Sequence, residues 1–151
     1  IVTITNEAQN GLSLLSKDAK AEASSYVNEA EAPKFAVDGD LGTKWCATGS
    51  APHVLTVDLG SLKTVSEIRM AHAAAGGESP SMNTRAYTLE LSEDGTNFHE
   101  VSRTASNSAS NTINIFAAAS ARFIRLTVNQ PTQGADLAVR LYEFEAYGLT
   151  K

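Results

Sequence analysis

The sequence predicts an all-β domain, folded as an antiparallel sandwich or barrel. Apolar residues recur at every second position in several short segments, which is the period of a strand with one buried face. Clusters of Gly, Pro, Asn and Asp separate these segments at spacings of about 10 to 20 residues, a pattern typical of all-β folds. The expected strands are residues 53–59, 65–71, 87–92, 112–116, 122–128 and 139–147.

The N-terminal part of the chain is the least regular. Residues 6–31 are rich in Ala, Glu and Lys, which suits a helical turn, whereas residues 24–26 (Ser-Ser-Tyr) favour strand or loop. The first clear strand is residues 53–59, and it ends at the Leu59-Gly60-Ser61 turn. A second alternating run follows at residues 65–71.

Two strands are expected in the middle of the chain. Residues 87–92 alternate apolar with polar side chains and lead into a Glu-Asp-Gly-Thr turn at residues 93–96. Residues 112–116 place Ile at alternate positions. The Ala-rich stretch 117–121 is too short for a helix of its own, and we predict a loop there.

The last two strands lie on either side of an Asn-Gln-Pro turn at residues 129–131. They are residues 122–128 and 139–147. No internal repeat or low-complexity linker divides the chain, so we predict a single domain over residues 1–151 with its core at about residues 10–148. The sequence begins with Ile1 rather than Met, and we expect a module excised from a larger protein.

Composition narrows the class of partner. The chain has 151 residues, 42% of them hydrophobic and 19% charged, which fits a folded domain, and no apolar run approaches the roughly 20 residues that span a bilayer. A net charge of -5 and a pI of about 5.1 disfavour polyanionic partners, so we expect no nucleic-acid binding. The single Cys46 cannot form an internal disulfide.

The sequence lacks the motifs of common enzymes. It contains no Gly-x-Ser-x-Gly elbow, no His-Glu-x-x-His pair and no phosphate-binding Gly-rich loop. Its histidines, His53, His72 and His99, are scattered, and an isolated histidine has no partner that would make it a base. We therefore expect no catalytic residues.

Polar side chains gather between two expected strands, in residues 72–85. An imidazole, a carboxylate, a carboxamide and a guanidinium in one loop offer the mixed donors and acceptors that bind sugar hydroxyls. The alternative is a solvated hairpin whose polar residues cap turns. The candidate residues are His72, Glu78, Asn83 and Arg85.

A second polar region, residues 33–45, contains Asp38 and Asp40 with intervening glycines. Such a loop can converge carboxylate and carbonyl oxygens on Ca²⁺, which takes six to eight oxygen ligands. The alternative is an Asx turn without an ion. Directly after this loop we expect Trp45 in the core and Cys46 as a small buried side chain.

Several motifs, in order along residues 15–148, resemble the discoidin, or coagulation factor 5/8 type C, domains. The resemblance implies a galactose-binding-like jelly-roll β-sandwich, in agreement with the alternation. The motifs are AVDGDLGTKW at 36–45, LTVDLG at 55–60, YTLELSEDG at 87–95, ARFIRL at 121–126 and YEFEAYG at 142–148.

The resemblance also implies a structural calcium ion. In this family the Asp-Gly-Asp loop and a glutamate of the last strand enclose calcium. Carried over by position, Asp38 and Thr43 supply side-chain oxygens, Lys34 and Asp40 supply carbonyls, and Glu143 is the last-strand carboxylate. The ion would hold the loop in shape rather than catalyse.

Within the family, residues 72–85 look most like those of family 32 carbohydrate-binding modules, which accompany secreted bacterial glycoside hydrolases. His72 and Asn83 match the places of two sugar-binding side chains there. Glu78 and Arg85 are expected to assist them.

These modules also usually offer an aromatic ring to the apolar face of the sugar, often from the last long loop. Here residues 129–138 contain no aromatic side chain. Tyr26 is the remaining candidate for an exposed ring, and a buried core position is its alternative.

We therefore expect a non-catalytic, monomeric module of an extracellular or cell-surface protein. It would bind terminal galactose, N-acetylglucosamine or disaccharides of these, and hold an attached glycoside hydrolase near its glycans. The alternative is a discoidin-type adhesion module that binds a protein receptor or a membrane surface. The lone cysteine and the acidic charge disfavour the membrane-binding branch of the family.

Overall fold

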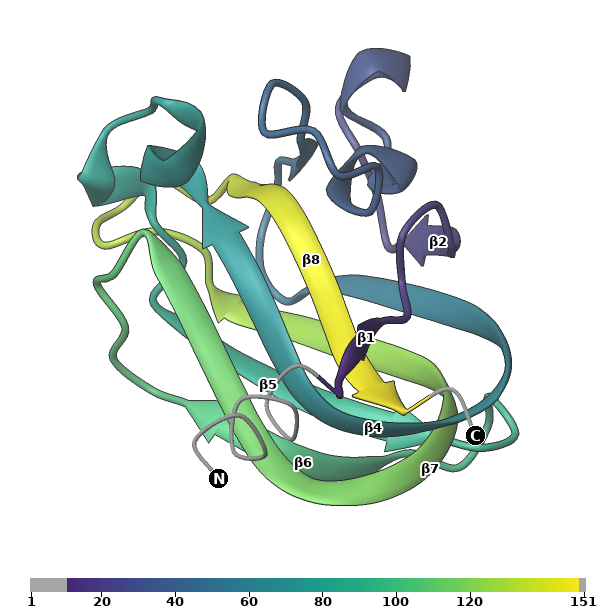
Figure 1. Ribbon diagram of the computed structural model, residues 1–151. Coiled ribbons are helices and arrows are strands. Elements are labelled where there is room, and N and C mark those ends of the chain that lie inside the picture. The colour runs from purple at the N-terminus through teal and green to yellow at the C-terminus, as the bar shows by residue number, and fades with distance from the viewer. Residues whose placement is uncertain (1–10, 150–151) are drawn as a thin grey trace.

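The computed structural model describes residues 11–149, which fold as an antiparallel β-sandwich (Figure 1). The strands are β1 (Ser13–Leu14), β2 (Lys20–Ala23), β3 (Trp45–Ala47), β4 (His53–His72), β5 (Ala86–Ser92), β6 (His99–Thr104), β7 (Asn111–Gln130) and β8 (Val139–Leu149). Short 3₁₀ helices are η1 (Glu29–Glu31), η2 (Pro33–Ala36), η3 (Ala73–Gly76) and η4 (Pro80–Met82). Within the described residues, no helix is long and apolar enough to cross a membrane.

Two long strands, β4 and β7, bend and contribute to both layers (Figure 1). Residues 53–58 of β4 pair with residues 123–128 of β7, and β2, β5 and β6 extend this layer. Beyond the bend, residues 63–71 of β4 pair with residues 111–121 of β7. In that second layer β8 pairs with the other side of β4, and β1 and β3 pair with β8.

The bend explains why local sequence divided these strands. Residues 53–59 and 65–71 form one strand, β4, as do residues 112–116 and 122–128 in β7. The predicted loop at 117–121 is wrong, because residues 119–121 pair with the bent part of β4. Pairing across the sheet here outweighs the weak strand propensity of Ala.

The N-terminal part of the described chain largely lacks the helical turn that was one of the two interpretations of its sequence. The expected helical turn over residues 6–31 is found only in η1, at its very end. Residues 6–10 lie outside the described part of the chain. From residue 11 to residue 28 the chain instead forms loops and the strands β1 and β2, of which β2 pairs with β4 through residues 55–58.

The hydrophobic core lies between the two layers. Trp45 is fully buried as predicted, and its indole N–H donates to the carbonyl of Ser25 at 3.0 Å. Cys46 is buried beside it, and burial raises the pKa of its thiol to about 11, so the thiol stays protonated at neutral pH. The largest other fully buried core side chains are Leu55, Ile68, Tyr87, Leu89, Leu91, Ile124, Leu126, Leu141 and Phe144.

One end of the sandwich carries most of the irregular structure. There β4 ends at His72 and β8 begins at Val139, with η3 and η4 on one side and η1 and η2 on the other (Figure 1). Both polar regions singled out in the sequence belong to this end. The fold therefore brings together loops that are far apart along the chain.

Candidate functional site

Four side chains from three segments form one polar cluster at the loop end of the sandwich, here called the Glu78 cluster. They are Lys44 from the loop before β3, Glu78 from the loop after η3, and Arg140 and Tyr142 from β8. Arg140 and Tyr142 are two positions apart on the strand, so their side chains lie on the same face of β8.

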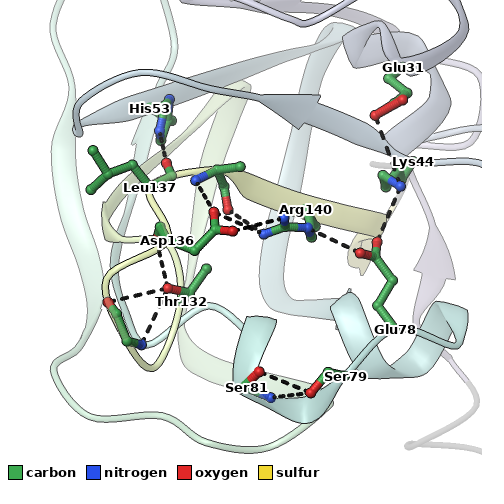
Figure 2. A network of polar contacts seen from close by, with 12 residues as sticks. Glu31, Lys44, His53, Glu78, Ser79, Ser81, Thr132, Asp136, Leu137 and Arg140 are labelled. Carbon is green, nitrogen blue, oxygen red and sulfur yellow. Dashed lines mark hydrogen bonds and ion pairs between the residues drawn. The ribbon is translucent and has the colours of Figure 1, made fainter.

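Glu78 is the acceptor that joins the cluster (Figure 2). Its Oε1 lies 3.1 Å from Arg140 Nε, and its Oε2 lies 3.2 Å from Lys44 Nζ. The Tyr142 hydroxyl donates to the same Oε2 at 2.6 Å. The charged side chains retain between 16% and 27% of their surface exposure, so the cluster is partly open to solvent.

Two glycines place Glu78 against Tyr142. A Cβ on Gly76 would lie 2.1 Å from Tyr142 Cε2, so only glycine lets the loop pass this close to the ring. Gly77 has a φ of +100°, in the left-handed region that favours glycine. The Gly-Gly-Glu sequence is therefore a requirement of this cluster.

The cluster favours its charged form. Burial opposes the ionisation of Glu78, but hydrogen bonds from Tyr142 and Lys44 outweigh it and lower the pKa of this carboxyl. For Lys44 burial likewise opposes the charge, and contact with Glu78 outweighs it and raises the pKa. Burial and the bond to Glu78 raise the pKa of Tyr142. At neutral pH the cluster therefore holds an ammonium, a guanidinium, a carboxylate and a neutral phenol.

Two further carboxylates border the cluster (Figure 2). Glu31 of η1 lies 3.9 Å from Lys44 Nζ, and Asp136 lies 3.3 Å from Arg140 Nη2. Asp136 also accepts from the backbone N–H of Ala138 at 2.8 Å, which lowers its pKa. Donors and acceptors thus alternate across the loop end, an arrangement suited to sugar hydroxyls, which donate and accept at once.

His72 lies in the interior, so its expected contact with sugar does not fit this arrangement. The side chain is only 1% exposed, and its Nε2 is 2.9 Å from the hydroxyl oxygen of Thr112. Burial lowers the pKa of His72 to about 4, so the ring is neutral at physiological pH. Its Nδ1 is buried without a hydrogen-bond partner.

Asn83 is also fully buried, and its amide is used within the protein. Its Oδ1 accepts from the N–H of Ala74 at 2.9 Å, and its Nδ2 donates to the carbonyl of Ser108 at 3.2 Å. The side chain therefore fixes η3 to the loop before β7. The expectation that it contacts sugar is replaced by this structural role.

The other predicted sugar-binding residues lie in different places. Glu78 is in the polar cluster, as described above. Arg85 is half-buried, and its backbone N–H donates to Gln130 at 2.9 Å. Sequence reasoning therefore identified one member of the Glu78 cluster.

Tyr26 is exposed, as one of the two interpretations of this residue required. It retains 43% of its surface and borders an open cleft of about 490 Å³. Its hydroxyl donates to Glu29 at 3.1 Å. Because η1 carries both Glu29 and Glu31, this short helix contacts Tyr26 on one side and Lys44 on the other.

Three of the residues expected to bind calcium, Asp38, Asp40 and Thr43, lie in the loop that follows η2, and Glu143 contacts this loop from β8. Thr43 Oγ1 donates to Asp38 Oδ2 at 2.6 Å, and the N–H of Gly39 donates to Glu143 Oε1 at 3.0 Å. Asp40 folds its carboxylate back onto the N–H of Gly42 at 2.7 Å, and its carbonyl accepts from Thr43. The loop thus contacts β8 through the backbone N–H of Gly39, which donates to the Glu143 carboxylate.

Lys34 lies at the start of this region, in η2. Its carbonyl accepts from the N–H of Val37 at 3.2 Å. Its ammonium lies 5.2 Å from the centre of the Phe35 ring, so the side chain points to a neighbour rather than to Asp38. Only the carbonyl of Lys34 was expected to take part in ion binding.

The charge of this loop is not balanced by basic side chains. Among residues 11–149 no Lys, Arg or His forms an ion pair with Asp38, Asp40 or Glu143, and no three His, Cys, Asp or Glu side chains gather closely enough to hold a metal by themselves. Burial raises the pKa of Glu143 to about 8, and the negative charge of Asp38 adds to this effect.

Lys44, Arg140 and Tyr142 were missed because each fits a simpler interpretation. Lys44 stands inside the motif read as a calcium loop, and Arg140 and Tyr142 stand in an alternating strand. The Gly76-Gly77 pair was a usable signal, because glycine is needed where a bulky side chain packs against the backbone or where the backbone is left-handed.

Family comparison agrees with this architecture. The model of the F5/8 type C domain matches residues 20–141. The chain belongs to the F5/8 type C domain family. A search of curated proteins finds no match.

Solved structures with this fold include several carbohydrate-binding modules. The family 32 carbohydrate-binding module of Streptococcus pneumoniae EndoD is 23% identical, with a TM-score of 0.81 over 90% of this chain and 99% of that one. Chitosan-binding module 1 of a chitosanase/glucanase from Paenibacillus sp. IK-5 is 28% identical, with a TM-score of 0.78 over 90% and 99%. A family 32 module from Clostridium perfringens, in complex with GalNAc-β-1,3-galactose, is 22% identical, with a TM-score of 0.77 over 89% and 99%. The predicted galactose-binding-like β-sandwich is thereby confirmed.

Proposed function

We propose that this F5/8 type C domain is a non-catalytic carbohydrate-binding module whose sugar site is the Glu78 cluster. The observation that carries the proposal is a half-buried carboxylate bonded at once to Lys44, Arg140 and Tyr142, at the loop end of the sandwich. A sugar hydroxyl can take the place of the Tyr142 hydroxyl as a donor to Glu78 and leave the ion pairs with Lys44 and Arg140 intact. The cleft beside Tyr26 offers a ring for an apolar sugar face on the far side of η1.

The relatives support sugar as the class of ligand, but they are named for different sugars. The Clostridium module was solved with GalNAc-β-1,3-galactose, and the Paenibacillus module is named for chitosan. For this chain we propose terminal galactose, N-acetylglucosamine or a disaccharide of these. A small sugar offers few atoms, so we expect a Kd of about 0.1 to 1 mM.

Glycan-array screening followed by calorimetry tests the sugar site. Arg140→Met removes one donor of the Glu78 cluster and should weaken binding to the array hit by about tenfold or more. The matched control is Arg103→Met, which removes an arginine that also pairs with a glutamate, Glu100, on the distant strand β6. No hit on a broad array, or equal affinity in the two variants, would contradict the proposal.

We further propose that the loop after η2 binds a structural calcium ion. Its support is the hydrogen bond between Thr43 and Asp38, the contact of Gly39 with Glu143, and the lack, within residues 11–149, of a basic side chain paired with Asp38, Asp40 or Glu143. The side chains of Asp38, Thr43 and Glu143 and the carbonyls of Lys34 and Asp40 would hold the ion. Bound calcium would neutralise the carboxylates and fix the loop that leads to Lys44.

Chelation tests the calcium proposal. EDTA should lower the melting temperature by about 5 °C or more, and calcium should restore it, since a ligand that binds only the folded state adds to its stability. Glu143→Gln should abolish the response. The control Glu145→Gln, two positions along β8, should keep it, and a melting temperature indifferent to calcium would refute the site.

The module is proposed to serve a larger extracellular or cell-surface protein. A binding site tethered to a glycoside hydrolase raises the effective concentration of glycan near that enzyme. All four residues of the Glu78 cluster belong to this chain, so the module can be tested alone.

A further inference from the structure

A cleft of about 490 Å³, here called the Tyr26 cleft, lies between the edge strand β2 and the short helices η1 and η2. This volume falls within the roughly 300 to 1,000 Å³ of small-molecule sites. On its cleft side, η1 places Glu29 against Tyr26. On its other side, η1 places Glu31 at 3.9 Å from Lys44 of the Glu78 cluster (Figure 2). The Tyr26 cleft is therefore a separate hollow beside the proposed sugar site.

The floor of the Tyr26 cleft is apolar and made of small side chains. Ala21 and Ala23, two positions apart on β2, are half-buried and pack against the hydrophobic core. Ala32 and Pro33, at the start of η2, are buried. Pro33 also has no backbone N–H that would need a hydrogen-bond partner. A ligand group that lies on this floor gains apolar contact and needs no hydrogen bond there.

Tyr26 forms one wall of the cleft. Its side chain keeps 43% of its surface exposed, although its hydroxyl donates to Glu29 at 3.1 Å. The hydrogen bond holds the side chain in one direction and leaves carbon atoms of the ring uncovered. Because the ring is already held in place, it loses little conformational entropy when a ligand packs against it. This wall therefore suits the apolar face of a pyranose ring.

The rim of the cleft carries charges of both signs. Glu22 and Glu29 offer carboxylate oxygens, Lys34 offers an ammonium group, and all three side chains are exposed. Glu22 lies 3.9 Å from Lys20, and Glu29 accepts from the Tyr26 hydroxyl, so each carboxylate already has a partner. Such a rim favours a neutral ligand with hydroxyl and amide groups over an ion, because it offers both donors and acceptors without a large excess charge.

We propose that the Tyr26 cleft is a second subsite and that it binds an N-acetylated sugar such as N-acetylglucosamine. The sugar ring packs against Tyr26, and the methyl of the acetamido group lies on the floor formed by Ala32 and Pro33. Hydroxyl groups and the amide N–H of the sugar donate to the carboxylates of Glu22 and Glu29. Galactose and glucose have no acetamido group and leave this floor in contact with water. The subsite rests on the proposed function for its class of ligand and has a preference of its own.

NMR titrations of the ¹⁵N-labelled full chain test the subsite, with N-acetylglucosamine and glucose as the two probes. N-acetylglucosamine should shift the backbone amide signals of residues 21–34. Its Kd there should be lower than that of glucose by about fourfold or more, the factor that corresponds to burial of one methyl group. Tyr26→Ala should weaken this binding by about fivefold or more. The matched control Val27→Ala, which truncates the neighbouring exposed side chain, should bind like the wild type.

A third variant separates this subsite from the Glu78 cluster. Arg140→Met removes a donor of the Glu78 cluster and should leave the shifts of residues 21–34 as they are. Loss of those shifts in Arg140→Met, equal Kd values for the two probes, or equal binding by Tyr26→Ala and Val27→Ala would overturn the subsite. No shift of residues 21–34 with N-acetylglucosamine would overturn it as well. The proposed function, by contrast, fails only if the sugar identified by the glycan array leaves the signals of Lys44 and Glu78 unmoved.

Discussion

Replacing His72 by Gln should remove an acid-sensitive group from the interior. Burial lowers the pKa of His72 to about 4 from an ordinary value of 6.5, so the folded protein favours the neutral ring. The stability linked to the neutral ring is fully present above pH 6.5, falls progressively as the pH drops from 6.5 to about 4, and is gone below that. A difference of about 2.5 in pKa, at about 1.36 kcal/mol each, corresponds to about 3 kcal/mol.

Urea unfolding at several pH values between 7.5 and 4.5 measures this effect. The free energy of unfolding of the wild type should fall by about 2 to 3 kcal/mol more than that of His72→Gln over this range. The matched control is His99→Gln, which removes an exposed imidazole and should follow the wild type. Parallel pH profiles for the wild type and His72→Gln would refute the interior assignment of His72. A loss of sugar binding at unchanged stability would return it to the sugar site.

Two further predictions concern the support of the Glu78 cluster. Gly76→Ala should destabilise the fold by about 1 to 3 kcal/mol and weaken sugar binding, because its Cβ meets the Tyr142 ring; Gly134→Ala, with open space around it, is the control. Urea unfolding compares the two, and equal stability would contradict the packing argument. Asn83→Ala should cost about 1 to 3 kcal/mol, because the N–H of Ala74 loses its acceptor. An unchanged melting temperature for Asn83→Ala would show that its hydrogen bonds do not support the loop.

The strands were predictable wherever burial alternates along the chain. Residues 87–92 became β5, and residues 139–147 became β8, each within two residues of the expected ends. Residues 117–121 were not predictable in the same way, because Ala has little strand propensity and the pairing that makes them a strand comes from the distant β4.

The candidate sites were predictable in unequal measure. Asp38 and Thr43 lie five residues apart in one motif, and their hydrogen bond is local. The burial of His72 could not be read from its neighbours, because its partner Thr112 comes from β7. Polar residues in a loop look exposed in sequence until a distant segment covers them.

The Glu78 cluster was not predictable from the sequence for the same reason. Lys44, Glu78 and Arg140 belong to three separate segments that only the folded sandwich brings together. Each charge looks like an ordinary surface residue in the sequence, and their common position depends on the loops that meet at the end of β4 and the start of β8.

The most direct test of the account is a crystal structure of this chain with the sugar identified by the glycan array. We predict sugar hydroxyls within hydrogen-bond distance of Glu78, Lys44 or Arg140, with His72 still buried behind them. A sugar bound elsewhere on the domain, with the Glu78 cluster untouched, would contradict the central claim.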